Sequence, residues 1–426
     1  MLSKSPAMVE TARAIYRHAL SVFPTKKTLW MSAAMLEKEH GTPSTLESVL
    51  QEAVKHCPTA EVLWLMAAKE KWLAGDVPGA RAILVAAFDA NPNSEQIWLA
   101  AVKLEWENEE INRARLLLTK ARGSAPTERM YMKAALLERE VGDIPAELAL
   151  LEEGISRYPS FAKYYMMAGQ ACHEVLKDLN LARQYYQRGT QHCPDNVTLW
   201  ILLAKLEVEA KGVIKARSTM ETARLKFPKN PDLWLQSIRF EHSIPGNEKL
   251  AEALMARALQ ECPDSGVLWS EQLMLCTKQQ QKSKSMDALK RCDNDPLVVL
   301  AIARLFEKDR KYAKAQQWFE RAVTLAPKLG DAWVYLYAFE LRQARLAKLG
   351  LGQQPNCDVV VEKCVAAQPN RGELWLSVAK RTEYRRKDVA TTLKKAVELA
   401  LGTAGAGLDS HKENGMSNND DDAAEA

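Results

Sequence analysis

The chain lacks the sequence features that mark membrane and secreted proteins. None of the apolar runs in its 426 residues reaches the ~18 residues that a membrane-spanning helix needs. The first ten residues also lack the apolar centre of a secretory signal. Its eight cysteines are scattered without a CxxC pair, which favours a reducing compartment, either the cytosol or the nucleus. We therefore expect a protein with no membrane partner and no disulfide framework.

Motifs for catalysis and cofactor binding are missing too. There is no GxxxxGK phosphate-binding loop, and the seven histidines show no triad-like grouping. The nearest approach to a zinc-binding HExxH motif starts at His173, but its fifth residue is Lys177. His56 and His192 each begin a His-Cys-Pro sequence, for which ordinary packing at a helix end is the simpler explanation. We expect no catalytic, cofactor-binding or metal site, no small-molecule substrate and no enzymatic activity.

The charge balance gives little support to a dedicated nucleic-acid surface. The chain has 58 basic and 54 acidic side chains, a net charge of +4. Two basic stretches, 278–284 and 381–387, could contact phosphate, although a solvated loop or helix face is the simpler interpretation. The second stretch is the better candidate for RNA, because it places an aromatic ring beside its cations. Its candidate contacts are Arg381, Tyr384, Arg385, Arg386 and Lys387. We expect any RNA contact to be indirect or minor.

What the chain does contain is a long internal repeat. A tryptophan follows a proline by six residues, and the pair returns about every 34 residues. This period is typical of stacked helical hairpins, which act through an extended surface. Because the tryptophans recur at one fixed position of the repeat, we interpret them as core residues rather than residues that stack on nucleic-acid bases. The repeat-core residues are Trp30, Trp64, Trp98, Trp200, Trp234, Trp269, Trp333 and Trp375. Where the prolines are Pro126, Pro159 and Pro296, the Trp position holds Met132, Tyr165 and Ile302.

The second helix of each predicted hairpin has its own pattern. Small residues recur twelve and five positions before the next proline, and a large residue recurs eight positions before it. Before Pro92, these three positions are held by Ala80, Ala87 and Leu84, respectively. Small side chains allow two helices to approach to ~8 Å. Charges recur as well, with a Glu seven positions after the Trp and an Arg eleven before the next Pro. Glu105 with Arg115, and likewise Glu207 with Arg217, could pair within a hairpin, or all four could be solvated.

These patterns predict an all-α fold, a right-handed α-solenoid of about ten to eleven repeats. Residues 1–23 read as the second helix of a truncated first repeat, and 24–400 as an array of about ten repeats. A longer insertion, an extended hairpin loop, is expected near 343–356. Residues 402–426 are rich in Gly, Asn, Asp and Ala and are expected to form a disordered acidic tail.

The repeat resembles a known class. The segments ARAIYRHAL (12–20) and ARQYYQRG (182–189) are similar to the tetratricopeptide repeat (TPR), and to its RNA-processing variant, the half-a-tetratricopeptide (HAT) repeat. WMSAAMLEKEHG (30–41), WLAAVKLEWEN (98–108), WLQSIRFE (234–241) and KDRKYAKAQQWFERAV (308–323) resemble the C-terminal half of the pre-mRNA-processing factor 6 family. The resemblance is close over about residues 1–342, and NRGELWLSVAK (370–380) still resembles the last repeat.

The resemblance implies a non-catalytic scaffold in pre-mRNA splicing, located in the nucleus. Its implied partners are spliceosomal snRNP proteins, bridged within the tri-snRNP through the helical-repeat surface. A HAT scaffold of another machine, for mRNA 3′-end cleavage or rRNA processing, is an alternative. A TPR chaperone adaptor is a weaker one, because the Lys that commonly follows the Trp position in that group is matched only by Lys133.

Overall fold

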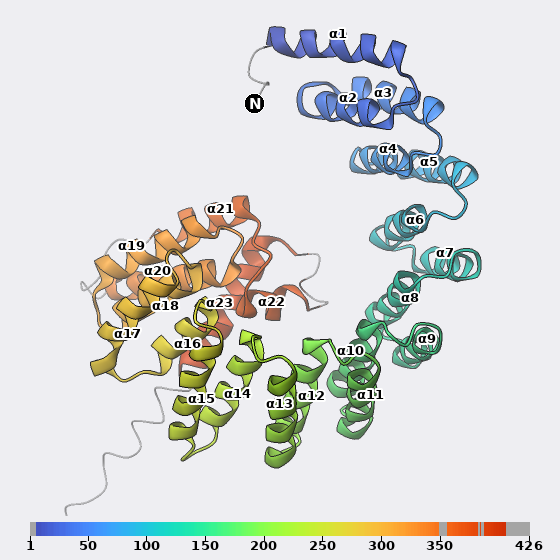
Figure 1. The fold of residues 1–426 in the computed structure, drawn as a ribbon. Helices are drawn as coiled ribbons and strands as arrows, with labels where there is room; N and C mark the ends of the chain where they lie inside the picture. The colour runs from blue at the N-terminus through green and yellow to red at the C-terminus, as the bar shows by residue number, and fades with distance from the viewer. Residues whose placement is uncertain (1–5, 349–355, 382–383, 385–386, 406–426) are drawn as a thin grey trace, which may run out of the picture. The chain divides into compact units, whose positions relative to one another are not determined.

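The structure, a computed structural model, describes residues 6–348, 356–381, 384 and 387–405. Regular structure in these residues is helical, apart from one isolated bridge between Leu329 and Arg371. After α1 (Pro6–Val22), the helices alternate between a first and a second helix of a hairpin, here called A and B helices (Figure 1). The predicted all-α helical-repeat solenoid is confirmed. No helix among the described residues is long and apolar enough to cross a bilayer.

The A helices are α2 (Lys27–His40), α4 (Glu61–Leu73), α6 (Glu95–Glu107), α8 (Glu128–Val141), α10 (Ala162–Gln170), α12 (Val197–Glu209), α14 (Pro231–Ser243), α16 (Gly266–Leu275), α18 (Pro296–Lys308), α20 (Gly330–Lys348) and α22 (Glu373–Ala379). The B helices are α3 (Pro43–His56), α5 (Val77–Ala90), α7 (Ile111–Ser124), α9 (Ile144–Arg157), α11 (Leu179–His192), α13 (Val213–Lys226), α15 (Glu248–Glu261), α17 (Lys278–Arg291), α19 (Tyr312–Leu325), α21 (Cys357–Ala367) and α23 (Val389–Gly405). A π-helical turn, η1 (Ala171–Val175), extends α10.

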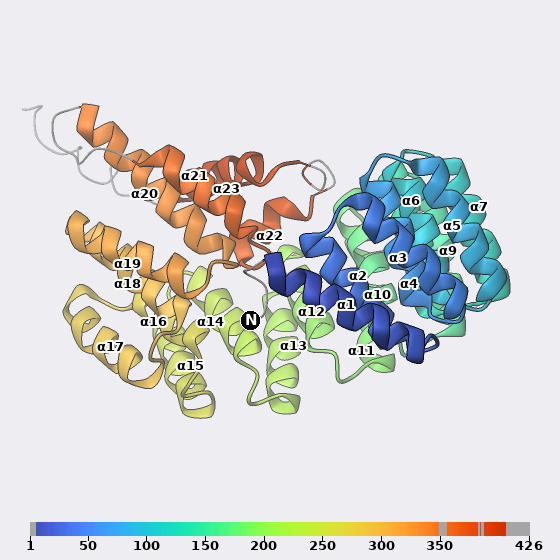
Figure 2. The same cartoon turned by 90° about the horizontal axis from the view of Figure 1, so that it is seen from above.

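The chain divides into two compact units, residues 1–206 and 207–426, with the boundary inside α12. Within each unit, hairpin follows hairpin in chain order (Figure 2). Local sequence sets the helix ends. The side chains of Asp76, Ser94 and Asn230 accept hydrogen bonds from backbone N–H groups in the first turns of α5, α6 and α14.

The B helices meet their neighbours through the predicted small residues. Ala80 and Ala87 of α5 are fully buried, and Leu84 between them is 4% exposed. Glycine takes the small position in α9 and α11. A Cβ atom on Gly154 would lie 2.9 Å from the ring of Tyr164, and one on Gly189 would lie 2.8 Å from the Cβ of Tyr165. The large tyrosines therefore require glycine at these crossings.

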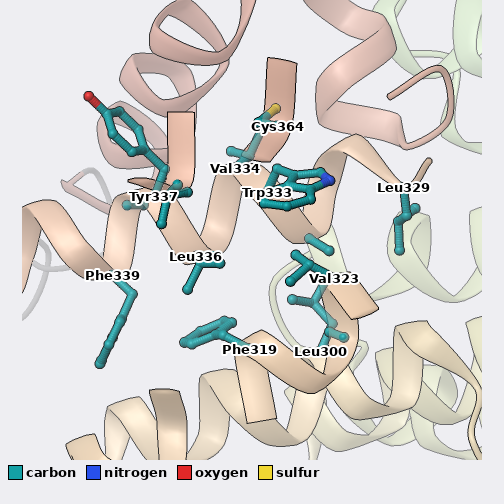
Figure 3. Close-up of a cluster of buried hydrophobic side chains, with 14 of the residues drawn as sticks. Leu300, Phe319, Val323, Leu329, Trp333, Val334, Leu336, Tyr337, Phe339 and Cys364 are labelled. Atoms are coloured by element: carbon teal, nitrogen blue, oxygen red, sulfur yellow. The ribbon is translucent and has the colours of Figure 1, made fainter. Parts of the chain in front are cut away.

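In unit 2, the core is continuous across α18 to α23. Trp333 and Leu336 of α20 face Phe319 and Val323 of α19, with Cys364 of α21 beyond them (Figure 3). All five side chains are at most 8% exposed. Such dense apolar packing between successive hairpins is the main source of stability in a helical-repeat array.

Two repeats have a different register from the predicted one. Helix α8 begins at Glu128, so the position equivalent to Trp234 in α14 is held by Tyr131, which is 1% exposed, and not by Met132. Pro296 is the first residue of α18, just as Pro231 is the first residue of α14. The position equivalent to Trp234 is therefore held by Val299, which is fully buried, and not by Ile302. The proline of this repeat belongs to the next helix, so counting prolines gives the wrong phase.

The predicted ends and insertion can be compared only in part. α20 continues to Lys348, so residues 343–348 of the predicted loop are helical instead, while 349–355 lie outside the described residues. α23 reaches Gly405, and residues 406–426 of the predicted tail also lie outside the described part. α1 occupies most of residues 1–23. Its assignment as the second helix of a truncated repeat stays a prediction.

Gly169 in α10 gives a direct test of the packing. A Cβ atom there would collide with the ring of Tyr186. We expect Gly169→Ala to lower the free energy of unfolding by about 1–3 kcal/mol, because this buried ring must shift. Gly123→Ala in α7 is the control, since nothing lies within 4 Å of the place that its Cβ atom would take, and it should be neutral or slightly stabilising. Equal urea midpoints for the two variants would refute the close crossing.

Candidate protein-interaction surface

The repeat-core tryptophans fall into two groups. Trp30, Trp234, Trp269, Trp333 and Trp375 are between 3% and 9% exposed. Trp64, Trp98 and Trp200 are half-buried. The two groups hold the same position in their hairpins. Their different exposed fractions therefore depend on which neighbouring side chains cover each indole ring.

The proline-to-tryptophan spacing has a second physical reason that the sequence reasoning missed. The indole N–H donates a hydrogen bond to the carbonyl oxygen of the proline six residues earlier, at 2.7–3.1 Å. The donors are Trp30, Trp64, Trp200, Trp234, Trp269 and Trp333. Tyr165, at the same position, donates its hydroxyl to the Pro159 carbonyl at 3.0 Å. Trp98 makes no such bond and packs against Phe88, with ring centroids 4.4 Å apart.

The recurring Arg and Glu residues connect successive hairpins. The Arg81 guanidinium of α5 binds both carboxylate oxygens of Glu105 in α6, each at 2.7 Å. Arg217 and Glu241 repeat the arrangement at 2.6 and 2.7 Å. The predicted pairing of Glu105 with Arg115 inside one hairpin is therefore wrong. The B-helix cation instead binds the A helix that follows it, because this pair of helices brings the two positions together.

We call this contact the inter-hairpin ion pair, and one repeat carries it with the charges exchanged. Glu47 of α3 stands at the Arg position, eleven residues before Pro58, and Lys71 of α4 stands at the Glu position. Their charged groups are 2.7 Å apart. A reversal that keeps the contact indicates that the pairing, and not either residue type, is what the packing requires.

Unit 2 has a network of charges along its A helices. Arg239 of α14 binds Glu271 of α16 at 2.8 Å and also Glu373 of α22 at 2.9 Å. Arg342 of α20 binds Glu307 of α18 at 2.8 Å. Arg239 and Glu373 are separated by 134 residues in the sequence. Their side chains can meet only because the row of A helices in unit 2 is curved. Arg239, Glu271, Glu307, Arg342 and Glu373 are here called the A-helix charge network.

Further polar groups extend this network. The Arg304 guanidinium lies 4.3 Å from the ring centroid of Tyr335, within the range of a cation–π contact. Asp331 accepts hydrogen bonds from the backbone N–H groups of Glu373 and Trp375 and so holds the start of α22 against α20. Burial raises the pKa of Glu307 and of Asp331 above their ordinary values. The result is a half-buried polar surface that offers both charges and an aromatic ring.

The remaining titratable groups do not converge. Among the described residues, no three His, Cys, Asp or Glu side chains lie close enough to hold a metal ion. The Cys172 thiol, next to His173, is fully buried, and burial raises its pKa to about 11. Cys57 and Cys193, in the two His-Cys-Pro sequences, are also buried and have raised pKa values for the same reason.

The candidate RNA contacts are only partly described. The Nε of Arg381 donates to the backbone carbonyl of Ser377 at 2.9 Å. Tyr384 is half-buried, and the ammonium of Lys387 lies 5.4 Å from its ring centroid. Arg385 and Arg386 lie outside the described residues. The other basic stretch, 278–284, begins the helix α17.

No protein-family model matches the chain. The chain is 40% identical over 249 residues to pre-mRNA-splicing factor prp1 of Schizosaccharomyces pombe, covering 58% of this chain and 26% of that protein. Over this segment the chain is similar to a pre-mRNA-splicing factor. Pre-mRNA-splicing factor 6 of Saccharomyces cerevisiae is 29% identical over 266 residues, 61% of this chain and 28% of that protein. Pre-mRNA-processing factor 6 of Homo sapiens is 50% identical over 126 residues, 30% of this chain and 12% of that protein.

The matched segments thus span between 12% and 28% of the length of these homologues. Solved structures with a similar arrangement include Naa15/Naa10 bound to HypK-THB, at 14% identity and a TM-score of 0.38, over 85% of this chain and 62% of that one. Yeast Tom70 has 13% identity and a TM-score of 0.37, over 80% of this chain and 94% of that one. At such scores, the likeness carries no argument about this chain.

Proposed function

We propose that the chain is a non-catalytic scaffold in pre-mRNA splicing, which acts in the nucleus by bridging proteins of the spliceosomal tri-snRNP. The observation that carries the proposal is its 40% identity over 249 residues to a pre-mRNA-splicing factor. That similarity supports a role in splicing. The bridging role is inferred from the repeat array, which has an extended surface on which several proteins can bind at once.

The A-helix charge network is the surface that we assign to protein binding. It combines carboxylates with partly exposed guanidinium groups and a tyrosine ring, and arginine and tyrosine are enriched at protein interfaces. Its Arg239–Glu373 contact is open to competition, since the Glu373 side chain is 66% exposed. A partner carboxylate can replace Glu373 at little cost. Direct RNA contact through the 381–387 stretch stays a prediction.

Affinity purification of the tagged chain from nuclear extract, followed by mass spectrometry, tests this function. We expect tri-snRNP proteins among the enriched partners, and about a tenfold lower recovery for the double variant Arg239→Gln, Arg342→Gln, which removes the cations without placing a like charge against Glu271 and Glu307. Arg113→Gln with Lys120→Gln, on the exposed side of α7, is the matched control and should keep the partners. Enrichment of cleavage factors, rRNA-processing proteins or chaperones in place of splicing proteins would contradict the proposal.

A further inference from the structure

Two arginines in unit 2 lie against the same tryptophan without a carboxylate partner. The guanidinium of Arg224, in α13, is 4.9 Å from the ring centroid of Trp234, and that of Arg257, in α15, is 5.8 Å from it. The Nε of Arg224 is buried and has no hydrogen-bond partner. Among the described residues, neither arginine is in an ion pair. Arg224 is half-buried and Arg257 is exposed, and a half-buried guanidinium without a counter-charge is costly.

The repeat itself shows how close the two positions come. Arg224 is four residues before Pro228, and Arg257 is six before Pro263. In unit 1, the same two positions are held by Arg122, four residues before Pro126, and by Glu153, six before Pro159. There the side chains meet in an ion pair of 3.1 Å. Arg224 and Arg257 therefore place two positive charges at positions that hold one positive and one negative charge in the Arg122–Glu153 pair.

We propose that Arg224 and Arg257 bind the phosphoryl group of a phosphorylated serine or threonine in a protein partner. Two guanidinium groups that converge beside a ring carry a charge of +2, which a phosphoryl group of about −2 neutralises at pH 7. A single carboxylate would leave one positive charge without a partner. Burial, together with the nearby charge of Arg257, lowers the pKa of the Arg224 guanidinium, although the carboxylates of Glu221 and Glu241 act in the opposite direction. Glu221 and Glu261 are the carboxylates one turn away on the same two helices, and neither contacts the arginines within ion-pair distance.

The neighbouring surface favours a protein as the carrier of the phosphate. Leu225, next to Arg224, is 74% exposed, and Ile214, on the same face of α13, is 82% exposed. Eleven residues separate them, about three helical turns. Exposed aliphatic side chains near an anion site suit a peptide that carries a phosphorylated residue and aliphatic side chains, whereas a nucleic-acid backbone gains little from them. This inference goes beyond the scaffold role and does not depend on the A-helix charge network.

Binding to two peptide libraries tests the inference. The probes are fluorescein-labelled 12-residue peptides with a fixed central phosphoserine, and the same library with serine. We expect the full chain to bind the phosphorylated library at least about tenfold more tightly, by fluorescence anisotropy. Arg257→Glu, which rebuilds the Arg122–Glu153 arrangement, should remove this preference and raise the melting temperature. The higher melting temperature also shows that the variant is folded.

Two controls make the outcome decisive. Arg321→Gln changes the arginine six residues before Pro327, which lies over Trp318 and has Asn294 as a partner, and it should keep the preference. A labelled ten-nucleotide RNA should bind more weakly than the phosphorylated library and should be little affected by Arg257→Glu. Equal binding of the two libraries, or a preference that survives Arg257→Glu, would overturn the proposal. So would RNA binding that is stronger than phosphopeptide binding and lost in that variant.

Discussion

Replacing Trp333 with alanine is expected to lower the free energy of unfolding of unit 2 by about 3–5 kcal/mol. The side chain is 4% exposed and lies at the centre of the cluster formed by α18 to α23 (Figure 3). The change removes a large apolar group, leaves a cavity, and also removes the hydrogen bond to the Pro327 carbonyl. Urea unfolding gives the magnitude, and hydrogen exchange along the chain gives the location, which we expect to be α19 to α23.

Two related variants separate packing from the hydrogen bond. Trp333→Phe keeps most of the apolar volume and loses the indole N–H, so it should cost less than the alanine variant. Trp64→Ala should also cost less, because Trp64 is half-buried although it makes the equivalent bond to Pro58 at 2.8 Å. If Trp64→Ala lowered the free energy of unfolding as much as Trp333→Ala does, the burial of a tryptophan would not determine how much it stabilises its repeat.

Reversing one charge of an inter-hairpin ion pair is expected to destabilise unit 1 strongly. Arg81→Glu would place a second carboxylate against Glu105, whose side chain is 7% exposed and cannot turn fully into water. We expect a loss of about 3 kcal/mol, since a nearly buried carboxylate loses its partner and gains a like charge. The urea midpoint measures it.

The double reversal is the decisive control for this contact. Arg81→Glu with Glu105→Arg recreates the order found naturally at Glu47 and Lys71. It should recover stability to within about 1 kcal/mol of the wild-type chain, because the two changes share one contact. If the losses of the two single variants simply added, the residues would be acting independently.

Sequence periodicity is sufficient for the fold class and for much of the core. The spacing of small residues predicts that Ala80 and Ala87 lie at a helix crossing, because packing at a crossing depends on the local sequence pattern. It does not give the partner of Glu105. A charge can meet either of two neighbouring B helices, and only the angle between hairpins decides that it meets Arg81 and not Arg115. The predicted register of the repeat at Pro296 is wrong for a related reason, since a proline fits both the end of one helix and the start of the next.

The interaction surface is harder to predict than the fold. Arg239 and Glu373 are far apart in sequence, and no periodic signal connects them. Their meeting depends on small rotations accumulated over four hairpins, which the sequence of any one repeat does not specify. The Arg224 and Arg257 pair could have been found from the sequence, by comparing each repeat with the positions of Arg122 and Glu153. That comparison requires knowing that these two repeat positions, on successive B helices, are in contact, which the structure shows for Arg122 and Glu153.

We propose that this chain holds splicing proteins on the A-helix charge network of unit 2. Site-specific photo-cross-linking tests it most directly, with benzoylphenylalanine in place of Tyr335, whose ring lies beside Arg304 in that surface. The same group at Val85, which is 60% exposed on the B helix α5, is the control. In nuclear extract, we predict cross-links from position 335 to tri-snRNP proteins and few or none from position 85. Splicing proteins cross-linked equally at both positions, or at neither, would contradict the account.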